Sequence, residues 1–117
     1  MSQDILTHDD VVMLVDKFYS TVLGDEILAP FFTHIDFDHH KPRMIHFWSF
    51  VLLDEPGYTT NIFDKHANMA LTADALQRWV LLFEQTARAC FSGEKTELAI
   101  LRAKTIAWTF QEKMNLT

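Results

Sequence analysis

Residues 36–53 of the chain, DFDHHKPRMIHFWSFVLL, decide the fold class. On a helix that turns about 100° per residue, four of them fall close to one line: His40, Met44, Phe47 and Val51. The pattern predicts a helix whose apolar face includes a histidine. Because Pro42 lacks an N–H and clashes with the carbonyl four residues earlier, we expect this helix to begin near His39 or His40 and to end at Leu53.

Longer helices are predicted on both sides of this stretch. Thr7 can cap a helix over residues 8–23, and Thr72 can cap another over 73–91, because a threonine hydroxyl accepts a hydrogen bond from the first helical turn. The first of these has an apolar stripe at helical spacing: Val12, Val15, Tyr19 and Val22. A last helix over 95–114 has two candidate rows: Leu98, Leu101, Thr105 and Trp108, or Ala103, Ala107, Phe110 and Met114.

Two short helices fit between the long ones, one over residues 25–33 with Pro30 inside it and one that holds Phe63 and His66. No convincing strand remains, and 3 glycines are too few for the tight turns of an all-β chain. The sequence therefore predicts an all-α fold. A length of 117 residues and 49% hydrophobic content fit a single domain over residues 1–117.

The net charge of the chain limits the kinds of molecule that it can bind. Ten Lys and Arg against 16 Asp and Glu give a net charge of −6, which argues against nucleic acid and an anionic membrane surface. The longest stretch without these four residue types, Met44 to Leu53, has ten residues, about half of the ~20 that span a bilayer. The single cysteine, Cys90, calls for no oxidising compartment. We expect a soluble, cytoplasmic protein.

Several kinds of catalytic site are excluded by their missing motifs. The chain has no glycine-rich phosphate loop, no HExxH, no CxxC and no G-x-S-x-G. A di-iron bundle needs two Glu-x-x-His motifs, and only Asp36-x-x-His39 comes near. The acidic and histidine cluster around it could hold a divalent ion, but a solvated helix start is the favoured interpretation. His8, among acids in a first helical turn, is interpreted as a surface residue.

The remaining histidines and the aromatic residues are more informative. His66 lies in an apolar-flanked segment, where a histidine is more often a hydrogen-bonded core residue than a ligand. Its combination with Tyr19, His40 and Trp79, among ten phenylalanines, suits a flat apolar metal cofactor. Spacing alone leaves both interpretations open.

The order and spacing of short motifs point to a family. They are Phe18-Tyr19, Pro30-x-Phe32, His40 followed seven residues later by Phe47-Trp48, Tyr58, His66 eighteen residues after Trp48, Arg78-Trp79 and Leu82-Phe83. From Val11 to about Met114 the chain resembles the truncated globins (truncated haemoglobins), specifically group III. The resemblance implies a globin-like, two-over-two helical sandwich with a shortened first helix and with haem b (protohaem IX, with its iron) at its centre.

The resemblance also implies roles for individual residues. His66 matches the proximal iron ligand and is the one metal ligand expected. The residues that match the distal ligand-binding pocket are Tyr19, His40 and Trp79. Besides His66, the residues expected to contact the haem are Phe32 at its plane, Arg43 at a propionate, Met44 over the distal face, and Phe47.

The expected function follows from this pocket. A tyrosine hydroxyl and an indole N–H can both donate hydrogen bonds to dioxygen, and the resemblance implies binding of dioxygen, nitric oxide and carbon monoxide. A polar pocket suits nitric oxide dioxygenation or peroxide reduction, either of which needs an external reductant. Two alternatives stay open: a haem-free helical module that binds a protein partner, and a haem-based sensor.

Overall fold

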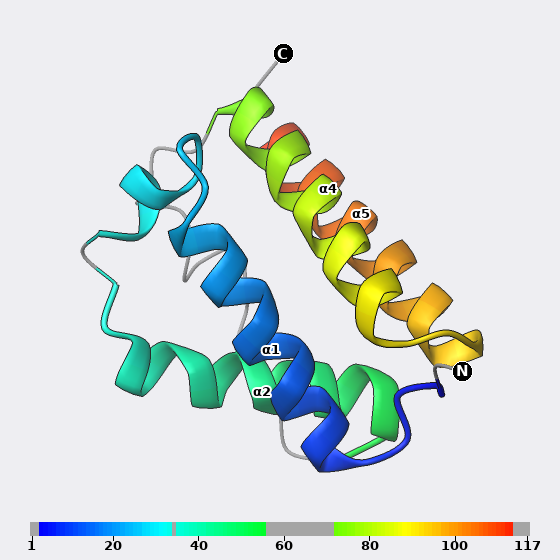
Figure 1. Ribbon diagram of the computed structural model, residues 1–117. Helices are drawn as coiled ribbons and strands as arrows, with labels where there is room; N and C mark the ends of the chain where they lie inside the picture. Colours follow the sequence, from blue (N-terminus) through cyan, green and yellow to red (C-terminus); the bar gives the residue numbers. More distant parts are fainter. Residues whose placement is uncertain (1–2, 34, 56–71, 114–117) are drawn as a thin grey trace.

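The computed structural model describes residues 3–33, 35–55 and 72–113. Within these ranges the chain forms helices and no strand: α1 (His8–Leu23), the short 3-10 helix η1 (Ala29–Phe32), α2 (Phe37–Leu53), α4 (Ala73–Cys90) and α5 (Glu94–Lys113). The helices α4 and α5 lie side by side, and α1 crosses α2 beside them (Figure 1). Because α1 also packs against α4 and α2 against α5, two helices cover two others. The predicted all-α fold is confirmed.

Both predicted threonine caps are present. The Thr7 hydroxyl accepts a hydrogen bond from the Asp10 N–H at 3.2 Å, and the Asp10 carboxylate accepts one from the Thr7 N–H at 3.1 Å, so α1 begins with a reciprocal capping box. The Thr72 hydroxyl accepts from the Ala75 N–H at 3.1 Å at the start of α4. These local contacts place the first residues of α1 and α4 where the sequence predicts them.

The predicted start of α2 near His39 or His40 is wrong, because the helix already begins at Phe37. The Asp36 carboxylate caps it by accepting from the Asp38 N–H at 3.1 Å. Pro42 therefore lies inside the helix and leaves the Asp38 carbonyl without its usual helical donor. Both residues are exposed, so water can hydrate that carbonyl.

The predicted short helix over residues 25–33 is also wrong in extent. Only Ala29–Phe32 is helical, as a single 3-10 turn. Pro30 lies in the first turn, where its missing N–H breaks no hydrogen bond within the helix. The turn directs Phe32 into the core.

The N-terminal segment caps α5 from a distance. One oxygen of Asp4 accepts from the Lys95 N–H at 2.8 Å, and the other accepts at 2.8 Å from both the N–H and the hydroxyl of Thr96. Gly93 has φ = 141°, and a Cβ there would lie 2.5 Å from Asp4 Cγ. A glycine is therefore needed for this close approach and for this backbone conformation.

Aromatic rings connect three of the helices around Phe83 of α4. Its ring stacks on Trp48 of α2 at 4.9 Å and on Trp79 at 5.9 Å, and meets Phe18 of α1 edge-on at 5.2 Å. On α5 the buried row is the one that contains Ala103, Ala107 and Phe110. The other row faces outward, with Leu101 60% and Trp108 63% exposed.

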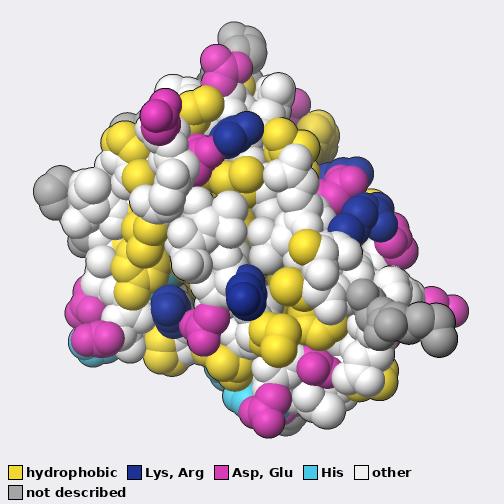
Figure 2. All heavy atoms as spheres, viewed as in Figure 1, with side chains coloured by type: hydrophobic (Ala, Val, Ile, Leu, Met, Phe, Trp, Pro, Cys, Tyr) yellow, Lys and Arg dark blue, Asp and Glu magenta, His cyan; other side chains and the backbone are white. Residues whose placement is uncertain are grey.

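The surface carries charges of both signs. On the face in Figure 2, basic side chains lie next to acidic ones, and hydrophobic side chains lie between them. The basic side chains that are coloured there form no single continuous patch. Among the residues in the described ranges, no helix is both long enough and apolar enough to cross a membrane.

Candidate functional site

Tyr19 and His40 come together although 21 residues separate them in the sequence. Tyr19 lies on the buried stripe of α1 with 4% of its surface exposed, and His40 lies in the first turns of α2. The Tyr19 hydroxyl is 2.8 Å from His40 Nε2, and the two rings meet edge-on with centroids 5.2 Å apart. The crossing of α1 and α2 thus places two of the predicted pocket residues in direct contact.

Two phenylalanines surround this pair. Phe37 contacts Tyr19 at 5.4 Å and His40 at 5.8 Å, both edge-on. Phe32 contacts Tyr19 at 6.1 Å and stacks on Phe37 at 6.5 Å. Burial raises the pKa of Tyr19 well above its usual value, so the phenol keeps its hydrogen at neutral pH. The pair is a part-buried polar contact flanked by aromatic rings.

Phe37 is a member of this site that the sequence analysis missed. It lies three residues before His40, which is the spacing that places two residues on one helical face. This helical spacing was not applied to Phe37, because the helix was expected to begin near His39 or His40, after Phe37. Its role became visible only with the actual start of α2.

Trp79 is half-buried, and the ring of Phe18 lies between it and Tyr19. Its indole meets Phe18 edge-on at 5.6 Å, and Phe18 contacts Tyr19 at 5.2 Å. The Trp79 N–H has no hydrogen-bond partner among the residues that the structure describes, and no side-chain nitrogen or oxygen there is both fully buried and unpaired. The indole N–H is therefore a donor that is not sealed inside the protein.

An ion pair fixes the end of α4 that carries Trp79. The Arg78 Nε and Nη2 atoms donate to one oxygen of Asp25 at 3.0 and 2.7 Å. The other Asp25 oxygen accepts from the N–H groups of Ile27 and Leu28 at 3.1 and 3.0 Å. The hydrogen bonds from Arg78 are the main cause of a lowered pKa at Asp25. This contact ties α4 to the connection that follows α1.

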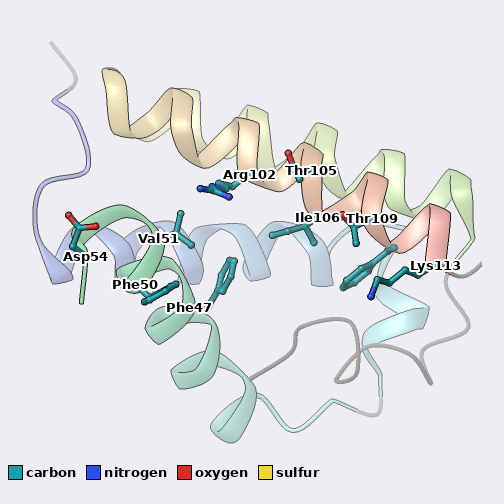
Figure 3. Close-up of a pocket in the computed structure, with 10 residues that line it drawn as sticks. Phe47, Phe50, Val51, Asp54, Arg102, Thr105, Ile106, Thr109 and Lys113 are labelled. Carbon is teal, nitrogen blue, oxygen red and sulfur yellow. The ribbon is translucent and has the colours of Figure 1, made fainter. Parts of the chain in front are cut away.

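The other predicted contact residues lie along α2. Met44 is buried at 8% exposure, Phe47 is half-buried with its ring 5.0 Å from Trp48, and Arg43 is exposed. Beyond Met44, Phe47 and Val51 line an open hollow of about 560 Å³ between α2 and α5 (Figure 3). The hollow is within the ~300–1,000 Å³ range of small-molecule pockets. The stripe of α2 therefore runs from the Tyr19–His40 pair to this hollow.

Comparison with known proteins agrees with this geometry. The Group 3 truncated hemoglobin ctb of Campylobacter jejuni is 25% identical over 121 residues, which cover 97% of this chain and 95% of that protein. The crystal structure of the group III truncated hemoglobin from Campylobacter jejuni superposes with a TM-score of 0.84 at 25% identity, covering 97% of this chain and 94% of the other. The fold is that of a group III truncated haemoglobin. No protein-family model matches the chain.

The proximal iron ligand expected from the truncated-haemoglobin pattern is His66. His66, together with Tyr58, lies outside the described residues, and its role as an iron ligand stays a prediction. Within the described part of the chain, no group of three or more His, Cys, Asp or Glu could hold a metal ion. The acidic and histidine cluster at the start of α2 is instead a cap and an exposed contact between His39 Nδ1 and Asp36 at 2.6 Å.

Proposed function

We propose that this chain binds haem and holds dioxygen and other diatomic gases in the pocket around Tyr19. The observation that carries the proposal is the Tyr19–His40 contact beside the rings of Phe32 and Phe37, in a group III truncated-haemoglobin fold. Burying polar groups is unfavourable unless they are hydrogen-bonded, so a core with no polar task would favour apolar residues at both positions. A polar pair within an apolar wall suits a small ligand that needs one or two directed contacts.

The residues that would hold the haem come from three parts of the chain. His66 is the proposed axial ligand, because it matches the family position eighteen residues after Trp48 and a neutral imidazole is a good ligand for iron. Phe32 and Met44 are buried and apolar, Phe47 is half-buried, and all three suit contact with a flat macrocycle. When bound, haem iron with a single histidine ligand supplies an open coordination position for a gas.

The polar groups of the pocket determine how a gas is held. Dioxygen can only accept hydrogen bonds, so an N–H or O–H donor favours it over carbon monoxide, which carries less negative charge. The N–H of Trp79, for which the described residues offer no hydrogen-bond partner, is such a donor. Arg43, exposed on α2, would meet an acidic side chain of the haem at the protein surface. Tight retention of dioxygen suits nitric oxide dioxygenation or peroxide reduction with an external reductant.

Absorption spectra of the purified protein in the ferric, ferrous and carbonyl forms test this proposal. We expect a Soret band in the wild type and its loss or strong weakening in His66→Ala. His39→Ala is the matched control, because His39 is an exposed histidine at the start of α2. A wild type that takes up no haem would favour the alternative, a haem-free interaction module. If His66→Ala kept a normal spectrum and His40→Ala lost it, the two sides of the haem would be reversed.

A further inference from the structure

The two most exposed large hydrophobic side chains in the described part of the chain lie together on the outer side of α5. Trp108 is 63% exposed and Leu101 is 60% exposed. They are seven residues apart, so they project from the same side of the helix, two turns from each other. Single exposed hydrophobic residues are common on monomeric proteins, but a row of them beside an apolar groove is typical of an interaction surface.

Such a groove lies between α4 and α5, and Trp108 is one of the residues that line it. Its volume is about 230 Å³. Val80 and Ala107 belong to its apolar lining, and its polar members are Gln77, Lys104 and Gln111. Pockets that bind small molecules have volumes of about 300–1,000 Å³. The groove is smaller than that, so it fits one side chain of another protein better than a small-molecule ligand.

The charged side chains along the groove neutralise one another. Lys104 is paired with Glu84 at 3.3 Å. Arg88 is paired with Glu84 at 3.3 Å and with Glu97 at 2.6 Å. Two positive and two negative charges therefore cancel there, although the whole chain has a net charge of −6. Two copies of an acidic chain repel each other, so they meet at the lowest electrostatic cost through a neutral face.

The uncharged polar groups of the groove also suit a second copy. The side-chain amides of Gln77 and Gln111 and the Trp108 N–H have no hydrogen-bond partner among the described residues. An amide both donates and accepts, so it can pair with an amide of the other copy across a two-fold axis, where a charged group would meet its own like charge. The exposed indole and the groove lie on one face, so each copy offers both halves of the contact.

The face formed by α4 and α5 has the size of a protein–protein interface. The two helices have 18 and 20 residues and lie side by side (Figure 1). At about 1.5 Å per residue and about 10 Å in width each, they form a face of roughly 30 Å by 20 Å. The relief of the side chains raises its accessible area toward the ~800 Å² per partner of a standard specific interface.

We propose that two copies of this chain bind each other through the α4–α5 face, about a two-fold axis, with the Trp108 indole of each copy in the groove of the other. A large aromatic side chain that enters an apolar groove is the kind of contact that dominates the binding energy of an interface. The dimer goes beyond the proposed function and does not depend on haem, because none of these residues belongs to the candidate gas-binding pocket.

Sedimentation velocity of the full-length chain, from about 1 µM to about 1 mM, measures the association. We expect a dimer of the wild type that dissociates on dilution. Trp108→Glu should raise the dissociation constant at least about thirtyfold, since the buried aromatic is lost from both halves of the contact. Gln77→Arg should weaken the dimer as well, because a long charged side chain then occupies the groove.

Met13→Glu is the matched control, because Met13 is a 47% exposed hydrophobic residue of α1 and its substitution adds the same negative charge as Trp108→Glu. It should leave the dissociation constant close to that of the wild type. Trp108 and Gln77 are both exposed, so their variants should fold, which circular dichroism checks. A wild type that is monomeric at the highest concentration, a dimer that is unchanged in either Trp108→Glu or Gln77→Arg, or an equal weakening in Met13→Glu would overturn the proposal.

Discussion

Replacing Asp4 by alanine should destabilise the fold far more than its position near the chain terminus indicates. Asp4 accepts hydrogen bonds from two backbone N–H groups in the first turn of α5 and from the Thr96 hydroxyl. Loss of a helix cap costs about 0.5–2 kcal/mol, and a buried hydroxyl left without a partner costs about 1–3 kcal/mol. Thr96 is fully buried beneath the half-buried Asp4, whose carboxylate is the partner of its hydroxyl. We expect Asp4→Ala to lower the free energy of unfolding by about 2–3 kcal/mol.

Urea denaturation followed by circular dichroism measures this change, and its dependence on pH provides a second check. Partial burial raises the pKa of Asp4, but the hydrogen bonds from Lys95 and Thr96 outweigh it and hold the pKa below the usual value. Since a lowered folded-state pKa stabilises the protein above the unfolded-state pKa of about 3.9, the gap between wild type and Asp4→Ala should be full at pH 7 and shrink as the pH falls below about 4.

Two further variants test whether Asp4 stabilises the start of α5. Asp9→Ala is the control, because Asp9 is an exposed acid in the first turn of α1 and should change stability only slightly. Gly93→Ala should be destabilising in the same direction as Asp4→Ala, since its Cβ would collide with the Asp4 side chain. A loss below about 0.5 kcal/mol in Asp4→Ala, equal to that of Asp9→Ala, would show that α5 does not depend on this distant cap.

Three further predictions concern the candidate site. Arg78→Ala should lower the melting temperature by breaking the contact with Asp25. Asp25→Ala should lower it further, because the Asp25 carboxylate also accepts hydrogen bonds from the N–H groups of Ile27 and Leu28. A decrease in Asp25→Ala that is equal to or smaller than that in Arg78→Ala would contradict this prediction. Trp79→Phe should speed dioxygen release by roughly tenfold and carbon monoxide release much less, since one donor is lost; equal changes for both gases in stopped flow would mean that the ring only shapes the cavity. His40 Nε2 already contacts Tyr19, so ferric protein at neutral pH should be mostly free of bis-histidine coordination, and a dominant low-spin bis-imidazole signal in electron paramagnetic resonance would exclude this.

Local signals explain why much of the helical pattern can be predicted from the sequence. The caps of α1 and α4 depend on contacts within three residues, so Thr7 and Thr72 already fix where these helices begin. The start of α2 was predicted two or three residues too late. The rule for Pro42 assumes that the orphaned carbonyl is costly, whereas here that carbonyl belongs to an exposed residue.

The sequence by itself determined the class of fold, the positions of the long helices and, through spaced motifs, the resemblance to group III truncated haemoglobins. Only the tertiary structure decided which row of α5 is buried, that Asp4 caps a helix some 90 residues away, and that Tyr19 and His40 share a hydrogen bond. The physical reason is the sequence distance over which each kind of interaction acts. Periodicity and capping act within a few residues, whereas these three features depend on the angle and depth at which separate helices pack.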